Sequence, residues 1–181
     1  MAEFTPVMTQ RAGNRLNMAA RIHRALDRGE FQLHFQPFVC IADGRTVALE
    51  ALLRWPQADG SSIAPAEFIG ISEDTGLIVP VGQWVLHEAA KAQRRLGDSG
   101  HGHISVAVNV SQAQFHKRDL AADFAAVYGQ FGLRPGALHV ELTYDPRLVQ
   151  TLAERCDPAS GACLLIEALN VDRPVRFPAA S

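Results

Sequence analysis

A nearly all-apolar run from Thr46 to Trp55 limits the possible folds more than any other segment, and Glu50 and Arg54 are its only charged residues. This length and composition are typical of a strand buried within a sheet. Side chains alternate between the faces of a strand, so Glu50, Leu52 and Arg54 share one face. Burying a carboxylate and a guanidinium costs free energy unless they bind something. The run therefore predicts a buried strand with a polar site on one face.

Strands and helices are predicted to alternate along the chain. The segment Phe31–Gln36 alternates strictly, which predicts a strand that stops at Pro37 or shortly after. Further strands are expected over residues 104–110 and 138–143, and helices over residues 16–28, 65–69, 82–96 and 120–131. Such alternation indicates a parallel α/β sheet or barrel. Residues 1–14 show no apolar period and are expected to form a disordered leader.

The predicted helix over residues 16–28 carries arginines between its apolar positions. An arginine-rich, acid-poor amphipathic helix is also compatible with a transit peptide. We favour docking of this helix onto the domain that follows, because docking requires the same pattern.

Composition excludes several classes of protein. The 181 residues carry a net charge of −2, which provides no basic field for a nucleic-acid polymer or an anionic membrane. No apolar stretch approaches the roughly 20 residues of a membrane span, and the first apolar run is too short for a signal peptide. The three cysteines, without C-x-x-C spacing, predict neither a disulfide framework nor a zinc site. We therefore expect a cytoplasmic protein.

Oxygen donors lie at or near the carboxyl ends of several predicted strands, where α/β folds place their sites: Glu50, Asn109 and Glu141. Two carboxylates and an amide suit a hard cation such as Mg²⁺. Each residue also has an ordinary alternative, because a strand glutamate can pair with an arginine and an asparagine can cap a helix. The pair His101 and His103 lies in a glycine-flanked loop, where a solvated turn is favoured over a metal site.

Six ordered motifs resemble those of the EAL-domain family, over about residues 15–150. They are Phe35-Gln36-Pro37, Glu50-Ala51-Leu52-Leu53-Arg54-Trp55, Pro65-Ala66-Glu67-Phe68-Ile69, Glu73-Asp74-Thr75-Gly76-Leu77-Ile78, Asn109-Val110-Ser111 with Gln114-Phe115, and Glu141-Leu142-Thr143. That family comprises bacterial cyclic di-GMP phosphodiesterases, which give pGpG, and inactive relatives, on a modified TIM barrel. The resemblance therefore implies a role in signal transduction through cyclic di-GMP.

The resemblance also implies roles for individual residues. Glu50, Asn109 and Glu141 are expected to ligate Mg²⁺ or Mn²⁺. Gln36, Leu52 and Arg54 match positions that line the dinucleotide, with Arg54 on a phosphate. A guanidinium fork suits that task, since it binds phosphate oxygens in a bidentate manner.

The sequence departs from the family pattern in its second half. Such phosphodiesterases hold a second ion with an Asp-Asp pair and use a later lysine, but this chain has no Asp-Asp pair and no lysine after Lys117. Tyr144 stands where the family has a glutamate, and residues 151–181 form a divergent tail without a match. We expect a truncated or degenerate member, either naturally shortened or frameshifted, whose incomplete barrel has about four to five strands. A homodimer or a partner domain would then cover the open barrel edge.

Three functions follow as alternatives. The first is a catalytically impaired EAL-domain protein that binds cyclic di-GMP or regulates through it. The second is an active phosphodiesterase whose missing ligands come from another chain. The third is a protein-interaction half-barrel without a nucleotide role.

Overall fold

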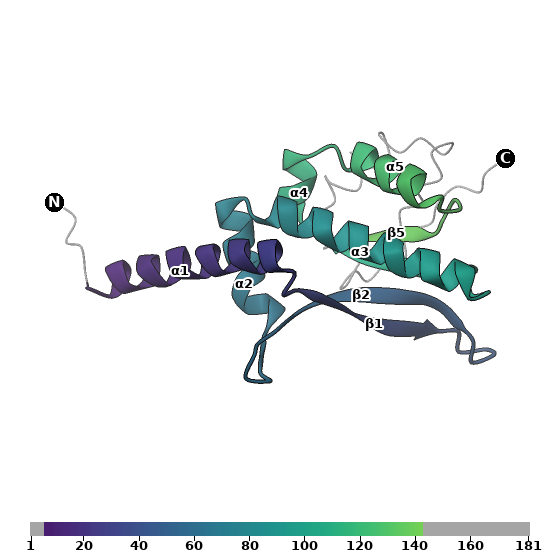
Figure 1. Cartoon of the computed structure of the whole chain (residues 1–181), viewed down its shortest axis with the longest axis horizontal. Helices are drawn as coiled ribbons and strands as arrows, with labels where there is room; N and C mark the ends of the chain where they lie inside the picture. The colour runs from purple at the N-terminus through teal and green to yellow at the C-terminus, as the bar shows by residue number, and fades with distance from the viewer. Residues whose placement is uncertain (1–5, 143–181) are drawn as a thin grey trace, which may run out of the picture.

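A mixed five-stranded sheet forms the centre of the protein in a computed structural model, which describes residues 6–142 (Figure 1). The order of strands is β1-β2-β4-β5, with β3 paired to β2. The strands are β1 (Gln32–Val39), β2 (Thr46–Pro56), β3 (Ser62–Ile63), β4 (Ser105–Val110) and β5 (Leu138–Leu142). The pairs β2-β4 and β4-β5 are parallel, as the alternation of elements predicts. The pair β1-β2 is antiparallel, because the short connection between them permits only a hairpin.

The helices gather on one face of the sheet, and the long helix α3 packs across β4 (Figure 1). They are α1 (Pro6–Arg28), α2 (Pro65–Thr75), α3 (Ile78–Asp98), α4 (Gln112–Lys117) and α5 (Leu120–Phe131). None of the helices in the described part of the chain is long and apolar enough to cross a membrane. Cys40 is a free thiol, whereas Cys156 and Cys163 lie outside the described residues.

Several element boundaries differ from those predicted. Helix α1 begins at Pro6 rather than Leu16, so the expectation of a disordered leader is wrong for residues 6–14. An apolar period identifies only the part of a helix that packs against the core. A docked helix can extend beyond that part, because each added residue forms one more backbone hydrogen bond. Strand β1 ends at Val39, shortly after Pro37, as predicted, and an edge strand tolerates this proline. Strand β5 is described as far as Leu142, and Thr143, the predicted end of that strand, lies outside the described residues.

Aromatic side chains hold the first strands and helices together. Phe31, directly before β1, lies 5.2 Å from Trp55 and 5.7 Å from Phe68 between ring centroids, and all three are at most 3% exposed. Ile22 of α1 is fully buried in the same core, and the Arg21 guanidinium lies 5.4 Å from the centroid of the Trp55 ring. The C-terminal half of α1 is thus docked on the domain, which is the arrangement that its sequence favoured over a transit peptide.

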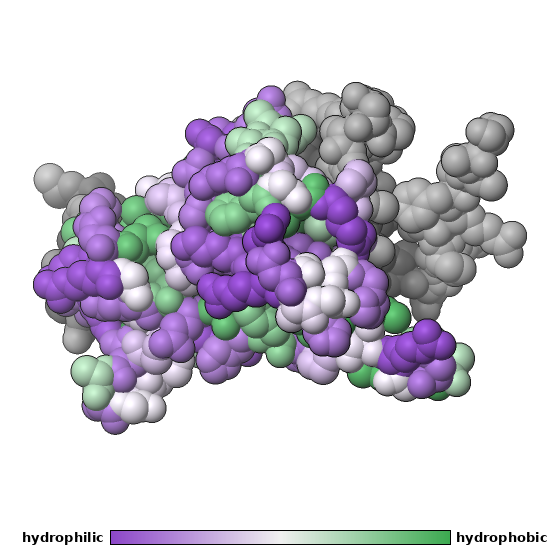
Figure 2. Space-filling view, turned by 45° about the vertical axis from the view of Figure 1, so that its right-hand side comes forward, coloured by the Kyte–Doolittle hydropathy of each residue, from purple (hydrophilic) through white to green (hydrophobic). Residues whose placement is uncertain are grey.

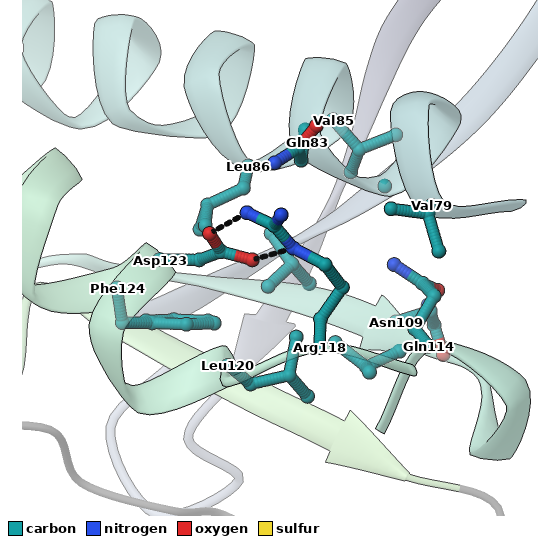
Figure 3. Close-up of a pocket in the computed structure, with 13 residues that line it drawn as sticks. Val79, Gln83, Val85, Leu86, Asn109, Gln114, Arg118, Leu120, Asp123 and Phe124 are labelled. Carbon is teal, nitrogen blue, oxygen red and sulfur yellow. Dashed lines mark hydrogen bonds and ion pairs between the residues drawn. The ribbon is translucent and has the colours of Figure 1, made fainter. Parts of the chain in front are cut away.

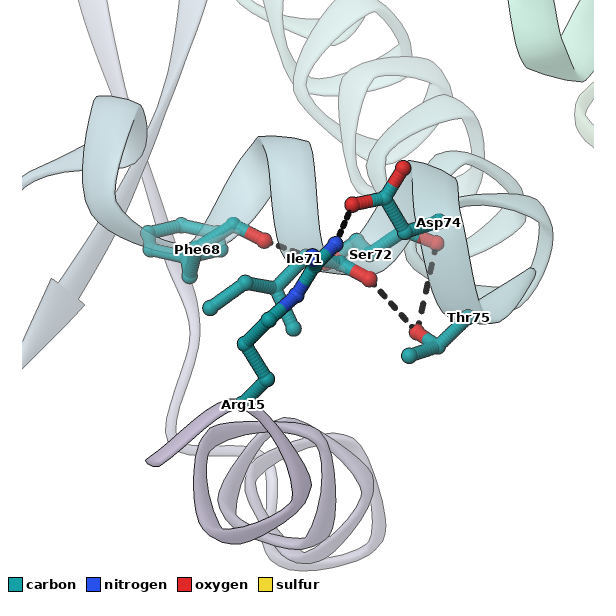
Figure 4. Close-up of polar contacts among 6 residues, drawn as sticks. All are labelled: Arg15, Phe68, Ile71, Ser72, Asp74 and Thr75. Carbon is teal, nitrogen blue, oxygen red and sulfur yellow. Dashed lines mark hydrogen bonds and ion pairs between the residues drawn. The ribbon is translucent and has the colours of Figure 1, made fainter. Parts of the chain in front are cut away.

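Helix α1 also contacts α2 through an ion pair between Arg15 and Asp74 (Figure 4). Both side chains are more than half exposed, so the pair contributes little to stability. Within α2, the hydroxyls of Ser72 and Thr75 donate to the carbonyl oxygens of Phe68 and Ile71. The contact leaves the Asp74 carboxylate engaged at the surface.

A glycine on α3 makes room for the start of α4. The Ser111 hydroxyl accepts a hydrogen bond from the Gln114 backbone, and Gln114 Oε1 accepts one from the Ser111 N–H at 3.0 Å, which together form a capping box. A Cβ atom at Gly82 would lie 1.6 Å from Gln114 Nε2. Because Gly82 has no side chain, the Gln114 side chain can pack against it. Gln114 in turn caps the start of α4, directly after β4.

The surface seen in Figure 2 is mainly hydrophilic, with small apolar patches between polar residues. Most of the large apolar side chains that are exposed in the described part belong to the β1-β2 hairpin, namely Phe35, Val39, Ile41 and Val47.

We predict that Phe68→Ala lowers the free energy of unfolding by about 3–5 kcal/mol, because it empties a fully buried position between aromatic rings. The measurement is a urea titration followed by circular dichroism. Phe35→Ala is the matched control: this side chain is 38% exposed, so no more than about half of that loss is expected. Equal losses for the two variants would contradict the packing described.

We predict opposite effects for two glycine-to-alanine substitutions in helices. Gly82→Ala should lower the free energy of unfolding by about 1 kcal/mol. The added methyl group would displace the Gln114 side chain and break its hydrogen bond with the Ser111 N–H. Gly70→Ala, where an added Cβ meets nothing within 4 Å, should raise it by about 0.5–1 kcal/mol. Thermal and urea unfolding of both variants test the difference, and a stabilised Gly82→Ala protein would refute it.

Candidate ligand and metal site

All the residues predicted to bind a ligand or a metal lie on one face of the sheet. In the β1-β2 ladder Gln36 pairs with Glu50, in the β2-β4 ladder Glu50 pairs with Ala107, and in the β4-β5 ladder Asn109 pairs with Glu141. Paired residues share a face, and so do residues two apart on a strand. The shared face thus carries Gln36, Glu50, Leu52, Arg54, Asn109 and Glu141.

The opposite face of the sheet contacts the helices. Ala51, Val106 and Val108, which alternate with the site residues, are at most 2% exposed. Side chains alternate between the two faces of a strand. The register that buries these residues under α3 therefore places the polar residues on the other face.

A hydrogen bond joins β2 to β4 on the polar face. Asn109 Nδ2 donates to Glu50 Oε1 at 2.8 Å, although the two residues are 59 positions apart in sequence. This contact replaces the ordinary alternatives: within residues 6–142 Glu50 forms no ion pair with Arg54, and the cap of α4 is Ser111 rather than Asn109. Glu50 and Asn109 are therefore adjacent, and their role as metal ligands stays a prediction.

Glu141 supplies a buried carboxylate beside them. It is 6% exposed and neighbours Asn109 in the parallel ladder, where adjacent strands are about 4.8 Å apart. Two carboxylates and an amide form an all-oxygen donor set, which fits Mg²⁺ or Mn²⁺. The described residues contain no group of at least three His, Cys, Asp or Glu side chains that could hold a metal ion, so the amide of Asn109 is needed for even three protein ligands.

A pocket of about 740 Å³ opens at the carboxyl ends of β2 and β4. Leu52 and Arg54 of β2 line it together with Asn109 of β4. Arg54 is half-buried and donates through Nη1 to the carbonyl oxygen of Leu53 at 2.9 Å. No carboxylate pairs with Arg54 among the described residues, so its positive charge has no counter-ion in residues 6–142.

A neighbouring pocket of only about 20 Å³ lies between β4, α3 and α5 (Figure 3). Figure 3 shows Arg118 beside Asp123, to which it donates from Nε and Nη2. This hydrogen bonding to Asp123 and its charge raise the pKa of Arg118. The space suffices for about one water molecule, so the ion pair is structural.

Two acidic residues that line the larger pocket were not singled out from the sequence. Glu73 and Asp74, near the end of α2, line the larger pocket. Both lie within a motif of the resemblance, but their spacing alone does not indicate a ligand.

His101 and His103 are both exposed, in agreement with a solvated turn.

Comparisons with known proteins agree with this architecture. The model of the EAL domain family matches residues 19–168, which extends past residue 150, where we expected the resemblance to end. The bifunctional diguanylate cyclase/cyclic di-GMP phosphodiesterase MucR of Pseudomonas aeruginosa is 36% identical over 77% of this chain, and PdeR of Escherichia coli, a cyclic di-GMP phosphodiesterase, is 32% identical over 77%. The chain spans only 20% and 21% of the lengths of these relatives.

Solved structures extend the comparison to the fold. The phosphodiesterase PaMucR, in a c-di-GMP complex, superposes with a TM-score of 0.72 at 31% identity, covering 82% of this chain and 62% of that one. The FimX EAL domain of Xanthomonas citri, in complex with c-diGMP, gives a TM-score of 0.71 at 18% identity over 86% of this chain and 62% of its own. The second likeness concerns the fold alone. From the family match and the shared TIM-barrel type of architecture, we conclude that the chain belongs to the EAL-domain family.

Proposed function

We propose that this chain binds cyclic di-GMP with a divalent cation and acts through binding, without hydrolysing the dinucleotide unaided. The observation that carries the proposal is the hydrogen bond between Glu50 of β2 and Asn109 of β4, because Asn109 also lines the larger pocket. The relatives named as cyclic di-GMP phosphodiesterases support the choice of ligand.

In this proposal Glu50, Asn109 and Glu141 hold the cation. Mg²⁺ or Mn²⁺ supplies positive charge that offsets the charge of the phosphodiester. The Glu50 carboxylate is oriented by the amide of Asn109, and the low exposure of Glu141 strengthens its attraction for a cation.

Gln36, Leu52 and Arg54 contact the dinucleotide in the same proposal. Arg54 meets a phosphate, since its guanidinium has no carboxylate partner in the described chain and lines the pocket. Leu52 packs against the ligand from the same face, and Gln36 hydrogen-bonds from the edge strand.

The sequence supports impaired hydrolysis. Phosphoryl transfer assisted by two ions requires ligands for both, whereas the polar face of the described sheet supplies two carboxylates and one amide. The chain has no Asp-Asp pair and no lysine after Lys117, the elements that the family uses for the second ion and the attacking water.

We predict that Arg54→Ala weakens cyclic di-GMP binding about tenfold or more, because it removes a charge-assisted contact with a phosphate. Calorimetric titration in the presence of Mg²⁺ measures the dissociation constant. Arg45→Ala is the matched control, since Arg45 lies in the β1-β2 connection and pairs with Asp43. If the intact protein shows no binding at high ligand concentration, the binding proposal is wrong and the interaction half-barrel remains.

We predict no conversion of cyclic di-GMP to pGpG by the purified chain with Mg²⁺ or Mn²⁺, as followed by chromatography. Conversion that Glu50→Ala abolishes would overturn the proposal of impaired catalysis. A specific activity that rises with protein concentration would instead support the active alternative, a phosphodiesterase site completed by a homodimer or another partner chain.

A further inference from the structure

Glu73 is an unexplained carboxylate in the larger pocket. It lies on α2, near the end of that helix, and lines the pocket with Arg54 and Asn109. Its side chain is half-buried, and within the described chain its carboxylate forms neither an ion pair nor a hydrogen bond. A partly buried carboxylate without donors carries a desolvation cost that a ligand with suitable N–H groups would remove.

Its neighbour Asp74 differs in this respect. Asp74 lines the same pocket, but Figure 4 shows its carboxylate directed to Arg15 of α1, with which it forms an ion pair. The two acids therefore lie at adjacent positions, and of the two only Asp74 has its carboxylate in an ion pair.

The rest of the pocket determines which ligand group suits Glu73. Arg54 supplies the cation for a phosphate, and a second anion placed beside the carboxylate would be repelled. Apolar side chains of Leu52, Pro65 and Ile69 form walls suited to a flat base. A group that is uncharged, planar and rich in N–H donors satisfies all three features.

We propose that Glu73 is a specificity residue that recognises guanine, accepting hydrogen bonds from the N1–H and the N2 amino group of one base of cyclic di-GMP. The inference rests on the proposed binding function. Adenine presents an unprotonated N1 at the corresponding edge, so the same carboxylate disfavours an adenine dinucleotide. Glu73 thus selects guanine by attraction and rejects adenine by repulsion.

The test compares cyclic di-GMP with cyclic di-AMP on the whole chain, by calorimetric titration in Mg²⁺. Glu73→Gln removes one of the two acceptors and supplies a donor, so we expect about a tenfold or greater loss of affinity for cyclic di-GMP, with no loss for cyclic di-AMP. Asp74→Asn is the matched control: it removes the same charge from the same pocket, and we expect the ratio of the two affinities to stay unchanged.

The ratio separates recognition from simple charge. If Glu73 only repels phosphates, Glu73→Gln raises both affinities together, which would overturn the proposal. An unchanged ratio in Glu73→Gln, in a protein that binds cyclic di-GMP, overturns it equally. Absence of cyclic di-GMP binding by the unsubstituted chain refutes the proposed function instead, and circular dichroism verifies that each variant is folded.

Discussion

The period of two along β2 is the constraint on which the other features depend. Ala51 and Trp55 point to the helices and are at most 2% exposed, while Glu50, Leu52 and Arg54 alternate with them on the other face. Shifting the register by one residue would place the charged groups in the aromatic core. The packing of Phe31, Trp55 and Phe68 therefore stabilises the fold and also fixes where the site residues lie.

The polar face is costly to maintain without a ligand. Glu141 is buried, Arg54 is half-buried without a carboxylate partner among the described residues, and the Asn109 amide is committed to Glu50. A cation and a phosphodiester would each meet the charge that complements them on this face. Binding of both is expected to stabilise the protein, since ligands that prefer the native state shift the folding equilibrium.

Much of this arrangement could be predicted from sequence because it depends on local signals. Helix α5 was predicted at its observed bounds, where Asp119 caps the Ala122 N–H and Gly132 adopts φ +59° beyond the end. The shared face of Glu50 and Arg54 followed from strand periodicity. The start of α1 was missed because the prediction relied on apolar packing, and α4 because its capping box, Ser111 with Gln114, was not considered as a helix start.

Other features depend on contacts between distant segments. Glu73 lines the pocket only because α2 folds back over the end of β2, and no spacing within α2 reveals this. The free state of its carboxylate likewise depends on Arg15, which lies on another helix and pairs with Asp74 instead.

Pro37 has a consequence for association between copies of this chain. Strand β1 has a single neighbour, β2, among the described strands, and proline provides no backbone N–H within it. A further strand added along β1 would lack one rung of its ladder at this position, which disfavours growth of the sheet in that direction. An assembly that unites residues of two copies in one site is therefore expected to form through a surface other than this edge.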